Sequence, residues 1–296
     1  MIEYRFDFEA MASINEVRLC APSETIAGAW VDAAVAEVRR VECKYSRYRS
    51  DSVTAEINRC AGADAVAVDH ETAALLDFGC RLHAESEGRF DLTSGVLRRA
   101  WDFRAQRVPA PAELASLLPL VGWDQVQWQR PWLRLPRAEM QIDFGGIGKE
   151  YAADRAATIL AERGARHGFI NLGGDVRGIG AMPGGGAWRI GIRHPRRSKA
   201  LIGGIDVTTG AVATSGDYER FFERDGVRYC HILDPRSGMP ATCWQSVSIA
   251  APICVAAGAC ATIAMLMPVD KALDFLRRQD VQYLAVAADG AVFEAQ

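Results

Sequence analysis

The spacing of apolar residues predicts long helices in the first part of the chain. Apolar residues recur at helical spacing after Ser23, which is suited to be an N-cap, and this pattern ends near Lys44. A second apolar stripe runs through 71–87 and stops at Gly88, a residue type that commonly ends helices. A third helix is predicted over 149–163. These segments indicate amphipathic helices with one buried face.

The later part of the chain alternates apolar and polar residues, which is typical of strands. Strands are predicted at 142–148, 167–172, 188–192, 227–233 and 246–249, with hairpins over 123–135 and 281–294. The alanine-rich apolar run at 253–267 predicts a buried helix. Strand blocks mixed with helices, without strict alternation, indicate an α+β fold with mixed or antiparallel sheets and packed helices. We expect one domain that spans residues 1–296.

Composition narrows the classes of function. The 296 residues are 49% hydrophobic and 24% charged, and the net charge of −3 gives no sign of a nucleic-acid partner. No apolar run reaches the roughly 18 residues that a membrane span needs, and the first residues show no secretory signal. The eight cysteines form no Cys-x-x-Cys pair, which favours reduced thiols. We therefore expect a cytoplasmic protein without a membrane span.

Polar residues concentrate in two short segments late in the chain. Residues 213–218 are Ala-Thr-Ser-Gly-Asp-Tyr, and residues 231–238 are His-Ile-Leu-Asp-Pro-Arg-Ser-Gly. Such side chains are costly to bury, so a loop rich in them indicates a site. His231 lies in an alternating pattern, and it is either a core histidine or a base that accepts a proton from a hydroxyl group. No nucleophile elbow supports a Ser–His–Asp triad.

Two glycine-rich turns follow predicted strands. Gly-Gly-Ile-Gly-Lys at 145–149 precedes a helix, and Gly173-Gly174-Asp175 follows the next strand. Glycines at such places let backbone N–H groups approach an anion, although neither turn has the spacing of a P-loop or a dinucleotide fingerprint. The two turns indicate either one shared nucleotide pocket or simple tight turns. Phe90-Asp91-Leu92-Thr93 is similarly compatible with a plain helix-stop turn.

In their order along the chain, these segments resemble the motifs of the ApbE family. The motifs are Met11-Ala12-Ser13, Ser46-Arg47-Tyr48, 88–93, 142–154, 171–175, 214–218 and 231–235. Each motif is weak by itself, but the ordered set is specific, and the resemblance covers most of the chain. The family consists of FAD:protein FMN transferases, so the resemblance implies an ApbE-like α+β fold.

The resemblance also implies a reaction and a set of site residues. Such enzymes bind FAD, cleave its pyrophosphate with the help of Mg²⁺, and attach FMN to a Thr or Ser hydroxyl of a target protein, with release of AMP. His231 is the implied general base, and Thr214, Ser215 and Asp217 line the reacting phosphates. The implied FAD-binding residues are Met11, Tyr48, Arg89, Phe90, Asp91, Lys149, Asp154, Gly173, Gly174 and Asp175, with Arg236 as an alternative anion contact.

One position departs from the family pattern. The buried C-terminal helix of the family carries Asp-Ala-x-Ala-Thr, whose Asp and Thr bind Mg²⁺ together with a backbone carbonyl of the helix after the first glycine turn. Here Thr262 is kept, Ala157 is the matching carbonyl donor, and Gly258 stands at the Asp position. Because Mg²⁺ binds through carboxylates and substrate phosphates, we expect a weakened site. The charge could come from Asp175, Asp217 or Asp234, the phosphates with Thr262 could suffice, or Gly258 could serve close packing.

Three functions remain open at this stage. The first is FMN transfer to a partner protein. The second is FAD binding with little transfer, because the metal-site carboxylate is missing. The third is an FAD pyrophosphatase that uses water as the acceptor. On the first view, Gly258→Asp is expected to raise the affinity for Mg²⁺.

Overall fold

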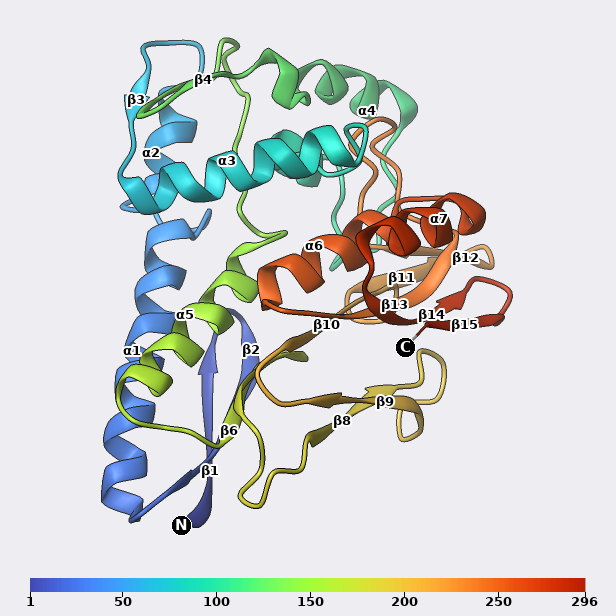
Figure 1. Ribbon diagram of the computed structural model, residues 1–296. Helices are drawn as coiled ribbons and strands as arrows, with labels where there is room; N and C mark the ends of the chain where they lie inside the picture. The colour runs from blue at the N-terminus through green and yellow to red at the C-terminus, as the bar shows by residue number, and fades with distance from the viewer. Residues whose placement is uncertain (296) are drawn as a thin grey trace.

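The structure, a computed structural model, describes residues 1–295. Its centre is an eight-stranded sheet with the order β1-β2-β6-β7-β10-β13-β14-β15, in which all neighbouring strands are antiparallel (Figure 1). The strands of this sheet are β1 (Ile2–Ala10), β2 (Ser13–Ala21), β6 (Gly168–Leu172), β7 (Asp175–Gly180), β10 (Ala211–Gly216), β13 (Trp244–Ala251), β14 (Gln282–Ala287) and β15 (Val292–Ala295).

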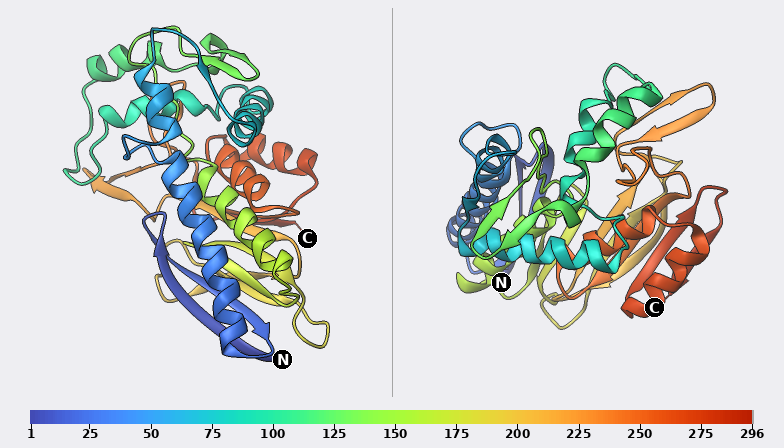
Figure 2. Two further views of the ribbon diagram at one scale, coloured as in Figure 1. Left: turned by 90° about the vertical axis from the view of Figure 1, so that its left-hand side faces the viewer. Right: turned by 90° about the horizontal axis from the view of Figure 1, so that it is seen from above.

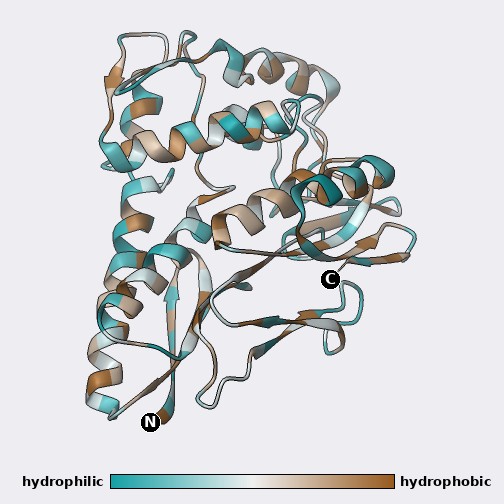
Figure 3. Ribbon diagram, viewed as in Figure 1, coloured by the Kyte–Doolittle hydropathy of each residue, from teal (hydrophilic) through white to brown (hydrophobic). Residues whose placement is uncertain are grey.

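Four helices pack beside the sheet. They are α1 (Glu24–Tyr45), α5 (Gly148–Glu162), α6 (Cys254–Met265) and α7 (Val269–Gln279). α5 lies between α1 and the central strands, and α6 packs on β10, β13 and α5. The hydropathy colouring in Figure 3 agrees with this placement, since α6 has almost no polar residue whereas α1 alternates apolar and polar turns. Burying these apolar faces is the main driving force that fixes the helices on the sheet.

A smaller, mainly helical part lies beyond one end of the sheet, at the top of Figure 1. It contains α2 (Val53–Arg59), α3 (His70–Glu85), the 3₁₀ helix η1 (Leu92–Arg99), α4 (Pro111–Leu117), the 3₁₀ turns η2 (Leu118–Leu120) and η3 (Trp123–Gln125), and a three-stranded sheet of β3 (Val66–Ala67), β5 (Trp132–Arg134) and β4 (Gln127–Gln129). α1 runs from beside the large sheet into this part, as the left view of Figure 2 shows. The two parts also share one continuous hydrophobic core.

Two short ribbons complete the fold. β8 (Trp188–Arg193) pairs with β9 (Leu201–Val207), and apolar side chains of this ribbon pack against β10 and β14. β11 (Phe221–Arg224) pairs with β12 (Val227–Cys230), and its aromatic residues pack against η1 and Trp101. This second ribbon connects the large sheet to the helical part, so residues that follow β10 and β12 come close to residues of η1.

The α+β class and the antiparallel character of the sheets are confirmed. The predicted helices at 71–87, 149–163 and 253–267 correspond to α3, α5 and α6 within a few residues. The strand predicted at 142–148 is wrong. The N–H of Ile142 donates to Oδ1 of Asn58 at 2.6 Å, and the N–H of Asp143 donates to the carbonyl of Leu92 at 2.8 Å. The side chain of Asn58 and the backbone at the start of η1 therefore hold this segment, and it joins no sheet.

One strand boundary and one hairpin also differ from the prediction. β12 ends at Cys230, so His231 lies beyond the strand that was expected to carry it. The β1–β2 hairpin was not predicted, although Tyr4, Phe6 and Phe8 alternate with polar residues and pack against the main core. Among residues 1–295, no helix combines the length and apolar character needed to cross a bilayer. All eight cysteines are free thiols.

Candidate functional site

A cavity of about 730 Å³ is lined by residues of both parts of the molecule. Its walls come from the β1–β2 turn, the end of α1, the segment before and within η1, the N-terminus of α5, the β6–β7 turn, β10 and the residues after β12. The volume falls within the range of roughly 300–1,000 Å³ that is typical of cofactor sites. Segments far apart in the sequence therefore converge on one site that is large enough for a nucleotide.

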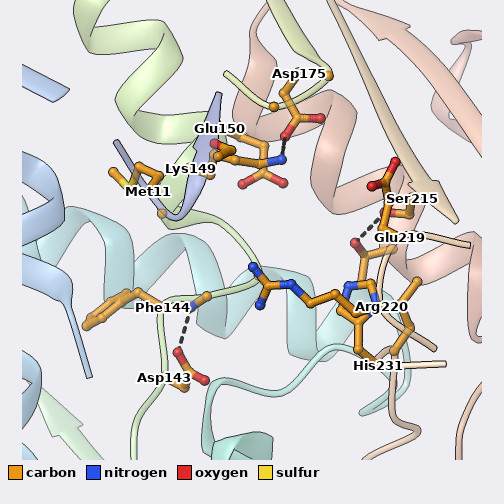
Figure 4. A pocket seen from close by; sticks show the side chains of 18 of the residues that line it. Met11, Asp143, Phe144, Lys149, Glu150, Asp175, Ser215, Glu219, Arg220 and His231 are labelled. Carbon is orange, nitrogen blue, oxygen red and sulfur yellow. Dashed lines mark hydrogen bonds and ion pairs between the residues drawn. The ribbon is translucent and has the colours of Figure 1, made fainter. Parts of the chain in front are cut away.

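The β1–β2 turn projects Met11 into the cavity (Figure 4). Met11 and Ala12 form the two-residue turn, and each has a φ of 55°. Turns of this kind usually carry Asn or Gly, because side chains disfavour positive φ. The N–H of Met11 donates to Oε1 of Glu42 on α1 at 2.7 Å, and this bond holds the strained turn in place. Backbone strain of this kind is often retained at binding sites.

The N-terminus of α5 supplies an anion-binding wall. No side chain caps this helix within the described chain. The N–H of Gly148 donates to the carbonyl of Phe144 at 2.7 Å, so the N–H groups that can meet a ligand are those that follow it in the first turn. Lys149 lies in the first turn, and its Nζ is 2.6 Å from Oδ2 of the buried Asp175. Burial acts to lower the pKa of Lys149, but the carboxylates of Asp175 and Glu150 outweigh it and leave that pKa above its ordinary value. Lys149 is therefore a permanent cation at the cavity wall.

The β6–β7 turn lies directly beside this wall. Gly173 and Gly174 have φ values of +58° and +104°, which side chains rarely adopt, and both line the cavity. A Cβ at Gly173 would also lie 2.9 Å from Cβ of Ser13. The two glycine-rich segments predicted from the sequence thus meet at one place, even though only the second follows a strand.

A row of hydroxyl groups lines another wall. Oγ of Ser215 is 2.9 Å from Oγ1 of Thr262 on α6, and Oγ1 of Thr214 is 2.8 Å from Oγ of Ser248. Thr214, Ser215 and Thr262 line the cavity. These oxygens can donate to phosphate oxygens or bind a hard cation.

His231 faces the same cavity from the segment after β12 (Figure 4). Its N–H donates to the carbonyl of Arg220 at 3.0 Å, while its side-chain Nδ1 is buried and has no hydrogen-bond partner within residues 1–295. Burial, together with the positive charges of Arg98 and Arg220, lowers the pKa of His231 to about 4. The imidazole is therefore neutral near pH 7, which is the form that can accept a proton.

We expect a titration of His231 by NMR to show this low pKa directly. In the free protein, the ring should stay neutral from pH 8 to pH 5, whereas an unfolded chain has an ordinary histidine pKa of about 6.5. Because the unfolded state takes up this proton first, the contribution of His231 to stability should fall as the pH drops from about 6.5 towards 4. Added FAD should raise the pKa, since its phosphate charges oppose the arginines. A free-protein pKa near 6.5 would show that the ring lies in water.

A cluster of arginines at the cavity was not predicted from the sequence. Arg47 forms an ion pair with Asp143, and Nε of Arg98 is 3.7 Å from the same carboxylate. Arg47 also donates to the hydroxyl of Tyr48 at 2.5 Å, and its guanidinium lies 4.7 Å from the ring centroid. Arg220 lines the cavity beside His231. Asp143 belongs to a motif that was recognised, but no sequence pattern pointed to Arg98 or Arg220.

Phe90, Arg89 and Asp91 line the cavity as expected, although the carboxylate of Asp91 also has a structural role. It accepts from the N–H of Thr93 at 2.7 Å and from the N–H of Trp123 at 2.9 Å. Arg89 is buried, and its Nη1 donates to the carbonyl of Ser86 at 3.0 Å. The carboxylate of Asp91 therefore satisfies backbone N–H groups, as the helix-stop turn interpretation predicts. Phe90 lines the cavity.

Three of the expected catalytic and FAD-binding residues do not line the cavity. Asp154 accepts from the N–H groups of Cys254 and Val255 at 2.8 and 2.9 Å and caps the N-terminus of α6. The carboxylate of Asp217 accepts two hydrogen bonds of 2.6 Å from Arg196, and Arg236 pairs with Asp234 at 2.6 Å. The carboxylates of Asp217 and Asp234 are thus already paired with arginines, and neither residue lines the cavity, which disfavours them as sources of the missing metal-site charge.

Replacing Asp154 tests its structural role. We expect Asp154→Ala to lower the free energy of unfolding by about 2 kcal/mol, because α6 loses a cap that binds two N–H groups. Arg177, whose Nε is 3.0 Å from the same carboxylate, would also lose its partner. Urea unfolding measures the stability, and FAD titration under native conditions should give unchanged affinity. A large loss of FAD affinity without a loss of stability would restore Asp154 to the binding site.

The side chain of Glu150 lies against Gly258, the position where the family has its metal-binding Asp. A Cβ at Gly258 would lie 2.6 Å from both Cγ and Oε1 of Glu150, a residue that lines the cavity. Oε2 of Glu150 is buried without a hydrogen-bond partner in the described part of the chain. A carboxylate thus lies against the position where the sequence lacks one, and an unpartnered oxygen is available for a cation. Ala157, in contrast, is buried in α5 away from the cavity, whereas Gly148 lines it.

The comparisons with known proteins agree with this geometry. The ApbE family model matches residues 11–285. The chain belongs to the ApbE family. A FAD:protein FMN transferase of Treponema pallidum is 35% identical over 272 residues, which cover 83% of this chain and 75% of that protein. This ApbE family member is thus a homologue of FAD:protein FMN transferases.

Solved ApbE structures extend the match to the whole fold. The crystal structure of the ApbE protein from Thermotoga maritima superposes with a TM-score of 0.91 at 33% identity, and it covers 100% of this chain and 97% of that chain. The flavinyl transferase ApbE of Pseudomonas stutzeri, in its apo form, superposes with a TM-score of 0.85 at 27% identity and covers 100% and 95%. The ApbE fold expected from the motifs is therefore confirmed.

Proposed function

We propose that this ApbE family protein is an FAD:protein FMN transferase that attaches FMN to a Thr or Ser hydroxyl of a target protein. One observation carries the proposal. A single cavity combines apolar residues at Met11 and Phe90, an uncapped helix N-terminus with Lys149, and the neutral base His231. These features match the flavin, the pyrophosphate and the acceptor hydroxyl. We also propose that residues 1–296 act as one domain, because segments between Met11 and Leu266, from both parts of the molecule, line the one cavity and share one hydrophobic core.

The transfer of FMN can be written so that all atoms and charges balance, with His231 as the base. His231 accepts the proton of the acceptor hydroxyl, and the oxygen attacks the phosphorus of the FMN half of FAD. The phosphoanhydride bond breaks, and a phosphodiester to the protein forms. AMP leaves with the electron pair of the broken P–O bond. The proton on His231 is then released to solvent or to AMP. A general base of this kind contributes about 10²–10⁴-fold to the rate.

The cavity walls stabilise the negative charge that builds up during transfer. Lys149 and the N–H groups at the start of α5 meet the pyrophosphate, and Arg98 and Arg220 lie near His231. A divalent cation, when bound, would neutralise further phosphate charge and favour departure of AMP. The chain offers Glu150 and the hydroxyls of Ser215 and Thr262 for it. Within residues 1–295, no group of three or more acidic, His or Cys side chains could hold a metal ion by itself.

Intact mass spectrometry tests the proposal. The protein is incubated with FAD, Mg²⁺ and a target domain that carries an acceptor Thr, and we expect the target to gain the mass of one FMN phosphodiester with an equal amount of AMP. A matched target with Ala at the acceptor position should stay unmodified. If the target stays unmodified under all metal conditions, the proposal is wrong.

The same incubation separates the two alternatives. Without a target, an FAD pyrophosphatase would release free FMN and AMP at an undiminished rate, whereas a transferase should release little. A protein that only binds FAD would retain it intact in both mixtures. Chromatography of the small molecules measures all three outcomes.

A further inference from the structure

Glu150 is a buried carboxylate that no protein group fully satisfies. Its residue is only 9% exposed, it lies in the first turn of α5, and its Oε2 has no hydrogen-bond partner in the region the structure describes. Leaving a carboxylate oxygen buried and unpartnered is costly, so such a group usually binds a ligand or an ion. Figure 4 shows Glu150 on the same wall of the cavity as Lys149 and Asp175.

The neighbouring helix leaves room for this carboxylate. Cβ of any larger residue at 258 would lie 2.6 Å from Cγ, 2.6 Å from Oε1 and 2.9 Å from Cδ of Glu150, which is closer than real contacts allow. Glycine is unfavourable inside a helix, and α6 is buried at this position. The close approach of Glu150 explains why glycine stands there. The two positions are therefore complementary, since the side chain that α6 lacks is replaced by one from α5.

The surroundings of Glu150 provide the other ligands that a hard cation needs. Thr262 lies on α6 one turn after Gly258, and its Oγ1 is 2.9 Å from Oγ of Ser215. The ammonium group of Lys149, on the same wall, is already paired with Asp175 at 2.6 Å. Oε2 of Glu150 therefore has no hydrogen-bond partner in the described part of the chain, and Glu150 lines the same cavity as Ser215 and Thr262.

We propose that Glu150 is the protein carboxylate that binds the divalent cation of this enzyme, from α5 instead of α6. Thr262 and Ser215 lie beside it, and the phosphates of FAD complete the coordination. The inference rests on the proposed function, because those phosphates come from the FAD substrate. Since no group of three metal-binding side chains of the acidic, His or Cys type exists within residues 1–295, the cation should bind tightly only together with FAD. Gly258→Asp should then not raise the affinity for the cation, because its Cβ would already lie 2.6 Å from Cγ and Oε1 of Glu150 and displace that side chain.

Binding of Mn²⁺ measures the assignment without relying on activity. Free Mn²⁺ is followed by electron paramagnetic resonance in mixtures with the protein and FAD, and FAD alone is subtracted. We expect one Mn²⁺ per wild-type chain, with affinity at least tenfold weaker in Glu150→Gln. Glu219→Gln is the matched control, because Glu219 also lines the cavity but already pairs with Arg193, and its Mn²⁺ affinity should stay near that of the wild type.

A carboxylate exchange provides the decisive variant. Glu150→Ala combined with Gly258→Asp moves the acidic group from α5 to α6, and we expect it to regain most of the Mn²⁺ affinity that Glu150→Ala alone loses. Gly258→Asp alone should bind Mn²⁺ no better than the wild type and should unfold at a lower temperature. Thermal unfolding and FAD fluorescence titration identify any variant that fails to fold or to bind FAD.

The outcomes separate this inference from the proposed function. Wild-type Mn²⁺ affinity in folded, FAD-bound Glu150→Gln overturns the assignment, even if FMN transfer occurs. Loss of Mn²⁺ in Glu150→Gln and its return in the exchange variant support the assignment, even if no target is modified. Higher Mn²⁺ affinity in Gly258→Asp that persists when Glu150→Gln is added would also overturn it, because the ion would then bind at α6 without Glu150.

Discussion

His231→Ala should reduce the rate of FMN transfer by about 10²–10⁴-fold while FAD binding remains nearly unchanged. The expectation follows from the position of the ring. It faces the cavity, its Nδ1 has no partner in residues 1–295, and burial keeps it neutral at pH 7. Removing the imidazole therefore removes a proton acceptor without removing a positive charge that FAD uses. Single-turnover transfer and fluorescence titration of FAD measure the two quantities separately.

A matched variant separates catalysis from packing. His231→Gln keeps a polar side chain of similar size but cannot accept the proton, so it should lose transfer as His231→Ala does. Both variants should unfold within a few degrees of the wild type. If FAD affinity falls as much as the rate in both variants, His231 is a ligand contact and not the base.

Lys149→Met should have the largest effect on both FAD affinity and stability. A charged hydrogen bond contributes roughly 1.5–3 kcal/mol, so FAD should bind about 10- to 100-fold more weakly. The variant also leaves Asp175 unpaired, and Asp175 is only 3% exposed. Breaking a buried ion pair typically costs about 3 kcal/mol of unfolding free energy. Urea unfolding measures this loss.

The loss of unfolding free energy in Lys149→Met should depend on the pH and on the presence of Asp175. Burial raises the pKa of Asp175, and the ammonium of Lys149 opposes that rise. Burial already holds the pKa of Asp175 above its ordinary value, and without Lys149 this pKa rises further. The destabilisation relative to the wild type should therefore grow as the pH increases above the folded-state pKa of Asp175 in the wild type. Adding Asp175→Asn should recover most of the stability but none of the FAD affinity. Equal FAD affinity in Lys149→Met and wild type would show that the pyrophosphate lies elsewhere.

The helices and the ordered motifs were predictable because their signals are local. The 3.6-residue spacing after Ser23 and the stop near Lys44 correspond to α1, whose N-cap Ser23 accepts from the N–H of Ile26. The glycines at 173 and 174 have positive φ, as their turn required. Each of these features depends on neighbouring residues along the chain, so the amino-acid order is sufficient to detect it.

The missed features depend on partners far away in the sequence. Residues 142–148 were predicted as a strand. However, the N–H of Ile142 donates to the side chain of Asn58, and the N–H of Asp143 donates to the carbonyl of Leu92. Asp154 was assigned to the flavin, but its carboxylate caps a helix that begins 100 residues later. Asp217 lies in a polar segment and was expected at the site, but its carboxylate is paired with Arg196. No local pattern contains this information.

The family and the α+β class were thus determined by the sequence itself, and His231 was already its candidate for the general base. The tertiary structure decided which polar residues share the cavity and which serve as caps or ion pairs. It also changed the meaning of Gly258, which in the sequence is only a missing carboxylate. In the fold, Gly258 is the space into which Glu150 extends from α5. The physical reason is that burial and pairing are set by packing between distant segments, whereas helical spacing and turn chemistry are set by adjacent residues.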